Sequence, residues 1–300
     1  MSTLKRQQLY QLLGDLPPLD SKITTKLLSK KECPGYILEH LEFQYGEKGE
    51  KIPAYFAAPK NVAKPPVVLF CHSHGGQYKL GKDELIKGNS YMYDPPYAEE
   101  LTAAGYATLC IDSPLFGERS GRDETDFFKE MIWRGKTVWG LMVYDNLRAI
   151  DYLQTRDDID VSRLATLGMS MGSTMAWWLA ALDERVKVCI DICCMTDFHE
   201  LINEGGLNGH GIYYYVPNLL KHFDTIGINA LIFPRPHLSV NGTLDTLTPA
   251  KGLEKINAAL IEIYKQAVAP DAWLMKNYPA EHVEIAEMRR DIMMFLKKWI

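Results

Sequence analysis

The chain has 300 residues and a formal net charge of −5, with 47% hydrophobic and 24% charged residues, the balance of a soluble globular protein. Its acidic balance gives no sign of the basic face that nucleic-acid binding requires, so we expect no nucleic-acid partner. Its apolar runs are far shorter than a membrane span, so we expect no membrane insertion.

Residues 1–40 are expected to form an N-terminal helical arm. The stretch "STLKRQQLYQLLGDL" starts at a capping Ser2 or Thr3, has leucines at helical spacing, and ends before Pro17-Pro18. The segment lacks the continuous apolar core of a secretion signal. The six cysteines show neither CxxC nor zinc-ligand spacing. We therefore expect a cytoplasmic protein with reduced thiols.

The pattern changes to a single α/β domain over residues 41–300. Two extended segments flank a turn rich in Gly, Glu and Lys, and short apolar runs then alternate with helical stretches. The expected strands lie at 66–71, 106–112, 164–168, 186–194, 237–242 and 273–278. The expected helices lie at 96–105, 138–156, 171–184, 249–267 and 282–300. This alternation predicts a mostly parallel central sheet flanked by helices.

Two segments of this domain point to a ligand site. In parallel sheets, ligands bind at the carboxyl ends of the strands. Residues 197–235 are too long for one simple crossover, and we expect a partly helical cap over those strand ends. Tyr213 and Tyr214 lie in this cap and are candidates for lining a substrate pocket, although packing within the cap explains them equally well.

The stretch "RLATLGMSMGSTMAWW" predicts a strand, a sharp turn and a helix, with Ser170 at the turn. This is the context of a nucleophile elbow, in which the residues flanking the serine must be very small. Gly168 and Gly172 meet that demand. The backbone N–H of Met171 would then point at a developing oxyanion. The alternative is an ordinary glycine-rich turn with an idle serine.

A catalytic serine needs a base and an orienting acid, which in this kind of fold follow it in the order acid, then histidine. Asp245 lies in the loop after the expected strand 237–242, and His282 lies after the last expected strand. Competing acids are Asp191, within a strand, and Asp197, just after it. We favour Asp245, and Asp197 stays open as an alternative.

The loop after strand 66–71 reads "HSHGGQ" and is the expected source of a second oxyanion amide, from His74 with Gly75 beside it. Gly75 is also a candidate pocket residue. A metal site on His72 and His74 is the alternative, but the sequence offers no carboxylate or cysteine at convincing spacing to complete it. His72 is better explained as a residue that shapes the loop.

A charged loop follows the expected strand 106–112 and reads "DSPLFGERSGR". Two interpretations of Asp112, Glu118, Arg119 and Arg122 stand side by side. The first is a salt-bridged loop that braces the edge of the sheet, and the second is contact with substrate. The first is the simpler explanation.

Taken together, these motifs resemble serine α/β-hydrolases of the dienelactone hydrolase and acetyl xylan esterase type. The resemblance covers about residues 35 to 300 and rests on "IPAYFAAPK", "HSHGG", "DSPLFGERSGR", "VYDNLRAIDYL", "GMSMG", "NGTLDTLTP" and "EHVEI". It implies Ser170 as nucleophile, Asp245 as acid, His282 as base, and oxyanion amides from Met171 and the His74 loop. Two features depart from the pattern. Dienelactone hydrolases proper use a cysteine, and the usual "HG" is "HS" here.

The resemblance implies an α/β-hydrolase fold and hydrolysis of carboxylic esters, with short acyl groups favoured by the small cap. It implies no metal and no organic cofactor, and a small-molecule ester as the binding partner. It leaves a homo-oligomer open. Alternatives are an acylaminoacyl- or prolyl-type peptidase, a thioesterase, and a non-catalytic scaffold of hydrolase shape.

Overall fold

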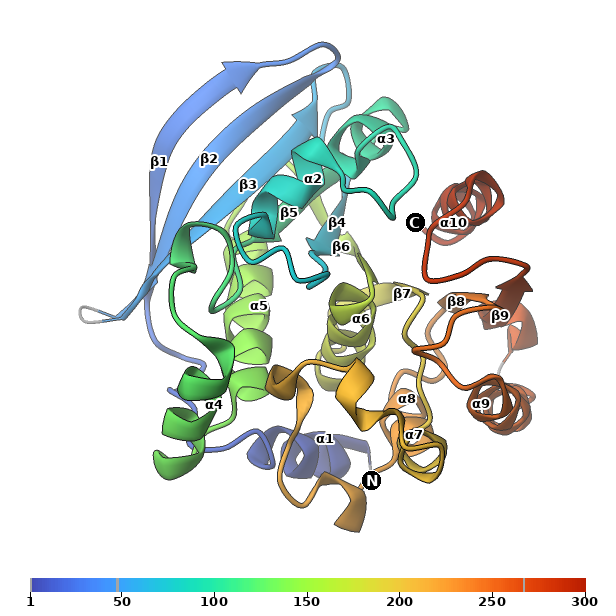
Figure 1. Ribbon diagram of the computed structural model, residues 1–300. Helices are drawn as coiled ribbons and strands as arrows, with labels where there is room; N and C mark the ends of the chain where they lie inside the picture. Colours follow the sequence, from blue (N-terminus) through green and yellow to red (C-terminus); the bar gives the residue numbers. More distant parts are fainter. Residues whose placement is uncertain (1, 47–48, 267) are drawn as a thin grey trace.

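A nine-stranded sheet runs through the computed structural model, which describes residues 2–46, 49–266 and 268–300 (Figure 1). The strand order is β1-β2-β3-β5-β4-β6-β7-β8-β9. The strands are β1 (Ile23–Glu32), β2 (Tyr36–Tyr45), β3 (Lys51–Pro59), β4 (Pro66–Cys71), β5 (Ala107–Ile111), β6 (Asp160–Met169), β7 (Val186–Ile192), β8 (His237–Gly242) and β9 (Trp273–Tyr278). Figure 1 shows β1–β3 at one end of the sheet and β9 at the other.

The sheet is antiparallel at its β1 end and parallel from β5 to β9. β1, β2 and β3 pair antiparallel in series, and β3 joins β5 antiparallel. β5, β4, β6, β7, β8 and β9 then pair in parallel. The carboxyl ends of these six strands therefore share one edge, which is where a ligand site is expected.

Helices cover both faces of the sheet and divide the hydrophobic core in two. The helices are α1 (Ser2–Gln11), α2 (Glu84–Lys87), α3 (Tyr97–Ala103), α4 (Glu124–Trp133), α5 (Val138–Gln154), α6 (Met171–Leu182), α7 (Phe198–Asn203), α8 (Thr225–Asn229), α9 (Ala250–Tyr264) and α10 (Ala286–Trp299). Buried side chains of α1, α5, α6 and α9 share one cluster, and those of α2, α3 and α10 share the other. This layering confirms the α/β-hydrolase architecture expected from the alternating pattern.

The expected strands and helices of residues 41–300 are present with small shifts at their ends. The apolar runs form β4 to β9, and the helical stretches form α3, α5, α6, α9 and α10. Ala267, the last residue expected in the helix 249–267, lies outside the described residues. Helix α4 was not expected, although "ETDFFKEMIW" places Phe127, Phe128, Met131 and Ile132 at helical spacing; Met131 is buried.

The expectation of a helical arm over residues 1–40 was wrong beyond the first helix. α1 is helical, and Arg6 docks it by donating to the carbonyl oxygens of Ala181 (3.0 Å) and Leu231 (2.8 Å). Residues 23–32 instead form β1, whose side chains are almost all exposed. Pairing with the free edge of β2, rather than burial of its own side chains, makes this segment a strand. Its lysines suit an edge strand, because they discourage pairing with other chains.

The segment expected to form a cap, residues 197–235, is built from short elements. It holds α7, three short 3-10 turns (Gly206–Gly209, Ile212–Tyr214 and Leu219–Lys221) and α8. Its aromatic and leucine side chains join the core cluster beneath α6. Figure 1 shows the middle of this segment in front of α6.

Candidate functional site

Ser170 occupies the sharp turn between β6 and α6. Its backbone lies at φ 58° and ψ −118°, a conformation that non-glycine residues rarely adopt. Its N–H donates to the carbonyl oxygen of Ile192 (2.9 Å), and its own carbonyl accepts from Thr174 (3.1 Å). Ser170 is partly exposed, whereas its neighbours in the turn are buried. The turn has the strain and the exposure that a nucleophile elbow requires.

The two glycines of the elbow are required by close backbone packing. A Cβ atom at Gly168 would overlap the backbone of Gly172 and the carbonyl oxygen of Cys71. A Cβ atom at Gly172 would overlap that same carbonyl oxygen. The end of β4 therefore lies directly against the elbow, and side chains on either glycine would push the two apart.

His282 and Asp245 lie together at the carboxyl edge of the sheet. His282 Nδ1 donates to Asp245 Oδ2 at 2.7 Å, across 37 residues of chain. Asp245 also accepts from the N–H of Leu247 (2.9 Å), and its side chain is 1% exposed, against 21% for His282. His282 Nε2 is buried and has no hydrogen-bond partner among the described residues. The pair thus fixes the imidazole and leaves its second nitrogen available.

The competing acids have other partners. Asp197 caps α7 by accepting from the N–H groups of His199 (3.1 Å) and Glu200 (3.0 Å), and it forms an ion pair with Lys255 (3.1 Å). Asp191 pairs inside the sheet with His237. The hydrogen bond to His282 is made by Asp245, whose role as the catalytic acid stays a prediction.

His72 shapes the loop after β4 through two backbone contacts. Its Nδ1 donates to the carbonyl oxygen of Ser73 (2.9 Å), and its Nε2 accepts from the N–H of Ser113 (3.1 Å). Burial lowers the pKa of His72, which keeps the ring neutral as these two contacts require. Because both ring nitrogens are engaged, a metal site on His72 and His74 does not fit this arrangement.

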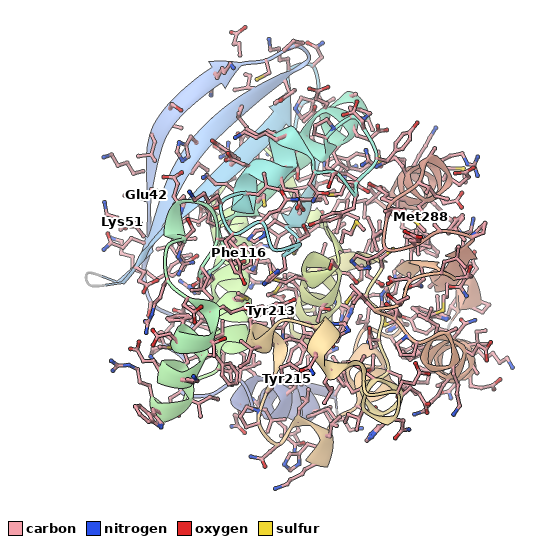
Figure 2. All side chains as sticks on the ribbon, in the orientation of Figure 1. Glu42, Lys51, Phe116, Tyr213, Tyr215 and Met288 are labelled. Carbon is pink, nitrogen blue, oxygen red and sulfur yellow. The ribbon has the colours of Figure 1, made fainter. Side chains whose placement is uncertain are left out.

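His74 is held within a group of aromatic rings. Its ring lies 5.2 Å from Phe116 and stacks on Tyr213 at 5.2 Å. Its Nδ1 accepts from the N–H of Gly76 (3.0 Å), and its Nε2 donates to Glu124 (3.2 Å). Figure 2 shows Phe116, from the loop after β5, and Tyr213, from the cap segment, near one another in the middle of the view. The structure therefore brings the His74 loop against the predicted cap.

Sequence reasoning missed a buried network under the loop after β4. Glu84 accepts from the N–H of Ser73 (2.9 Å) and from Asn89 (2.7 Å), and the Ser73 hydroxyl contacts both Glu84 and Tyr91. Tyr91 leaves no room for a side chain at Gly75, and its ring lies 6.4 Å from His282. Burial raises the pKa of Glu84 to about 7. The departure from "HG" to "HS" was the available signal, because Ser73 joins this network through its hydroxyl.

The charged loop after β5 braces the fold. Buried Asp112 accepts from the Lys82 ammonium (3.1 Å) and from the N–H of Glu118 (3.0 Å). Arg119 donates to buried Asp145 on α5 (2.7 Å), whereas Arg122 pairs with acids of α4. These contacts agree with the bracing interpretation.

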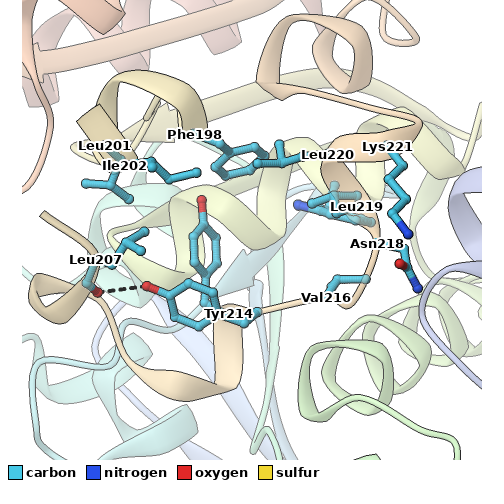
Figure 3. A pocket seen from close by; sticks show the side chains of 12 residues that line it. Phe198, Leu201, Ile202, Leu207, Tyr214, Val216, Asn218, Leu219, Leu220 and Lys221 are labelled. Carbon is cyan, nitrogen blue, oxygen red and sulfur yellow. Dashed lines mark hydrogen bonds between the residues drawn. The ribbon is translucent and has the colours of Figure 1, made fainter. Parts of the chain in front are cut away.

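The two cap tyrosines named as pocket candidates have different surroundings. Tyr213 packs on His74, as described above, whereas Tyr214 lines an apolar cavity of about 500 Å³ (Figure 3). Tyr214 also stacks on His210 at 5.6 Å, and His210 Nε2 donates to the carbonyl oxygen of Leu247 (3.0 Å), two residues beyond Asp245. Tyr214 therefore separates this cavity from the Asp245 loop.

Cys193 adds a thiol to the surroundings of the histidine–aspartate pair. It follows β7 directly and has a positive φ of 50°, and its Sγ lies 3.9 Å from the carbonyl oxygen of Val283. Ligand atoms of Cys193, Asp245 and His282 all lie within 4.8 Å of one another. Burial and the nearby Asp245 raise the pKa of Cys193, so the thiol stays protonated near neutral pH. No sequence motif points to this contact.

Comparison with known proteins agrees with this geometry. A family model described as alpha/beta hydrolase fold matches residues 66–204. A Bacillus subtilis (strain 168) protein named as a hydrolase, YtaP, is 47% identical over 301 aligned residues, which cover 100% of both chains. Within the described residues, we find no helix that is both long and apolar enough to cross a membrane.

Solved structures with the same fold include two carbohydrate esterases. A glucuronoyl esterase from Solibacter usitatus superposes with a TM-score of 0.71 at 15% identity, over 97% of this chain and 91% of that one. An acetyl xylan esterase from Paenibacillus sp. R4 gives a TM-score of 0.64 at 16% identity, over 100% and 92%. At such identities the likeness is one of fold. With the family match and the close relative, it establishes that this chain belongs to the alpha/beta hydrolase fold family.

Proposed function

We propose that this protein is a serine hydrolase that cleaves short-acyl carboxylic esters, such as acetyl esters, through an acyl-enzyme on Ser170. One observation carries the proposal. His282 is held by Asp245 at 2.7 Å, and its buried Nε2 has no hydrogen-bond partner in the part of the chain that the structure describes; both lie at the carboxyl edge that also carries the strained turn of Ser170. A fixed, half-engaged imidazole is what a serine nucleophile needs as its base.

In the proposed reaction the Ser170 hydroxyl attacks the ester carbonyl, and its proton passes to His282 Nε2. Asp245 holds the imidazole in the correct tautomer and stabilises its charged form. The N–H groups of Met171, at the start of α6, and of His74 donate hydrogen bonds to the oxyanion. The leaving alcohol takes the proton from His282. Water, activated by the same imidazole, then releases the acid and restores the free serine.

The comparisons support an ester substrate, because the two solved neighbours named above are esterases. The rings of Phe116 and Tyr213 pack against His74, whose loop is the proposed source of an oxyanion amide, and this supports a small acyl group. A location in the cytoplasm and self-association into a homo-oligomer stay predictions.

A substrate panel tests the ester proposal against the amide and thioester alternatives. Acetyl, butyryl, sugar-acetate and lactone substrates would be compared with matched anilides and thioesters on the purified protein. We expect kcat/KM to be highest for a short-acyl ester. A dominant preference for anilides would replace the proposal by a peptidase, and a dominant preference for thioesters would replace it by a thioesterase.

A fluorophosphonate probe tests for a catalytic serine against the scaffold alternative. We expect the probe to label the wild type and not Ser170→Ala. Ser173→Ala is the matched control, because Ser173 lies fully buried one turn along α6, and it should still be labelled. Absence of labelling in the folded wild type would favour a binding scaffold.

A further inference from the structure

The carboxyl edge of the sheet places a thiol beside the histidine–aspartate pair. Cys193 directly follows β7, the strand between β6, which leads to Ser170, and β8, which leads to Asp245. Its N–H donates to the carbonyl oxygen of Val240 (2.9 Å), which fixes its backbone to β8. The Ile192 carbonyl just before it accepts from Ser170. The thiol is thus held in place by both strands that deliver the proposed catalytic residues.

The backbone of Cys193 is strained in a way that packing must maintain. A φ of 50° is uncommon for a residue with a side chain and costs free energy unless neighbouring contacts enforce it. The Cys193 thiol is buried, and its ligand atom lies within 4.8 Å of those of Asp245 and His282. Sulfur, imidazole nitrogen and carboxylate oxygen are therefore gathered at one point.

We propose that Cys193, Asp245 and His282 form an inhibitory site for a thiophilic divalent cation such as Zn²⁺ or Cd²⁺. A set of one sulfur, one nitrogen and one oxygen suits these ions, and three protein ligands leave a fourth position for water. Ligand atoms of a tetrahedral zinc site lie about 3.3 to 3.6 Å apart. His282 Nδ1 and Asp245 Oδ2 are 2.7 Å apart, and the ligand atoms of the three residues lie within 4.8 Å of one another, so side-chain movements of about 1 Å would give that spacing.

Binding at this site would stop turnover without any change in oxidation state. The cation displaces the thiol proton to water as the metal–sulfur bond forms, and it takes up a ring nitrogen of His282 and an oxygen of Asp245. His282 then can neither accept the proton of Ser170 nor keep its contact with Asp245. The loss of turnover rests on the proposed function, whereas the binding itself does not.

The experiment uses the full chain, stripped with a chelator, and two independent readouts. The first is the ultraviolet charge-transfer band that Cd²⁺ acquires when it binds a thiolate. We expect this band in the wild type, in Ser170→Ala and in Cys194→Ser, a neighbouring buried thiol outside the cluster. We expect it to be lost in Cys193→Ser and weakened in His282→Gln, which keeps all six thiols.

The second readout is inhibition by Zn²⁺, expressed for each variant as a fraction of its own metal-free rate. We expect reversible inhibition that a chelator relieves. Cys193→Ser should raise the half-inhibiting concentration by about 10- to 100-fold or more, and Cys194→Ser should leave it unchanged. Equal inhibition of wild type and Cys193→Ser, or an equal Cd²⁺ band in both, would overturn the site. An unaffected rate despite a Cd²⁺ band that needs Cys193 would overturn its inhibitory role.

Failure of this site and failure of the proposed function give different results. If Ser170→Ala still hydrolyses esters, the proposed function is wrong, and the Cd²⁺ band still tests the site alone. If Cys193→Ser does not fold, the comparison of His282→Gln with wild type decides. An undiminished Cd²⁺ affinity in His282→Gln would overturn the three-residue site.

Discussion

Two histidine–aspartate pairs of this molecule have the same nitrogen–oxygen distance, but one is partly exposed and the other is fully buried. His282 and Asp245 are 2.7 Å apart at the carboxyl edge of the sheet, and the histidine side chain is 21% exposed. His237 and Asp191 are also 2.7 Å apart, but both side chains are fully buried between β7 and β8. The distance between the two side chains and their residue types therefore do not distinguish a candidate catalytic pair from a structural one.

The difference lies in what surrounds each pair. Asp191 also accepts from the hydroxyl of Ser239 (2.8 Å), and the ring of His237 packs edge-on against Trp273 at 4.9 Å. No substrate can approach His237 through that packing. His282 instead follows the end of β9, its side chain is partly exposed, and its Nε2 has no hydrogen-bond partner among the described residues. Access at the carboxyl edge, rather than the pair itself, makes a site.

Substitution of Asp245, the acid at the carboxyl edge of the sheet, should give the largest loss of kcat. Asp245→Asn would hold the imidazole in the wrong tautomer, and we expect kcat to fall by about 10⁴-fold, with little change in the free energy of unfolding. Steady-state kinetics on a short-acyl ester and urea denaturation measure both quantities. A nearly wild-type kcat would show that another group orients His282.

Substitution of the buried acid should reverse this pattern. Asp191→Asn disrupts a fully buried carboxylate that is hydrogen-bonded to His237 and Ser239, and we expect the free energy of unfolding to fall by about 3 kcal/mol. kcat should change far less than in Asp245→Asn, because Asp191 contacts neither Ser170 nor His282 among the hydrogen bonds of the described residues. A kcat loss as large as that of Asp245→Asn would mean that the two pairs are not independent.

The sequence could predict which residues lie at the carboxyl edge of the sheet, because this depends only on where the strands end. Ser170, Asp245 and His282 each follow an apolar run, and parallel strands bring such positions together whatever the exact register. The contact of His237 with Asp191 depends on side-chain direction inside the sheet, which follows from the register of β7 and β8. The sequence carries no local mark of that register, so Asp191 was recognised only as a strand residue.

Other features could not be predicted from the sequence because they depend on contacts between residues that are distant in the chain. β1 forms by pairing with β2, although its own sequence has no apolar periodicity. Glu84 accepts a hydrogen bond from Ser73 in a loop that matches no motif. Cys193 lies near Asp245 and His282 because β7, β8 and β9 are neighbours in the sheet. In each case the partner is distant in sequence or the signal is a single polar residue.

Glu84 is a third buried acid, and it differs from Asp245 and Asp191 because its hydrogen-bond donors, Ser73 and Asn89, are not histidines. With its pKa raised from 4.5 to about 7, folded Glu84 keeps a proton that the unfolded chain has lost. The free energy of unfolding therefore falls as pH rises through this window, by about 3 kcal/mol in all. Glu84→Gln removes that dependence.

We expect the stability of Glu84→Gln, relative to wild type, to increase from pH 4.5 to 7 and then level off. Urea denaturation of both proteins at several pH values measures the difference, in which the titration of all other groups cancels. A difference that does not change with pH would show that Glu84 ionises normally in the folded state.

The smallest effect is expected at Asp197, the acid left open as an alternative partner of His282. Asp197 caps α7 and pairs with Lys255, which is 43% exposed. Asp197→Ala removes the cap and the pair, and it should lower the free energy of unfolding by about 1 kcal/mol. Asp197→Asn retains an oxygen that can cap the helix and should cost less. Both variants should keep the wild-type kcat, since the His282 contact belongs to Asp245. A large kcat loss in Asp197→Asn, with stability preserved, would move the orienting acid to the end of β7 and overturn the contrast between edge and interior.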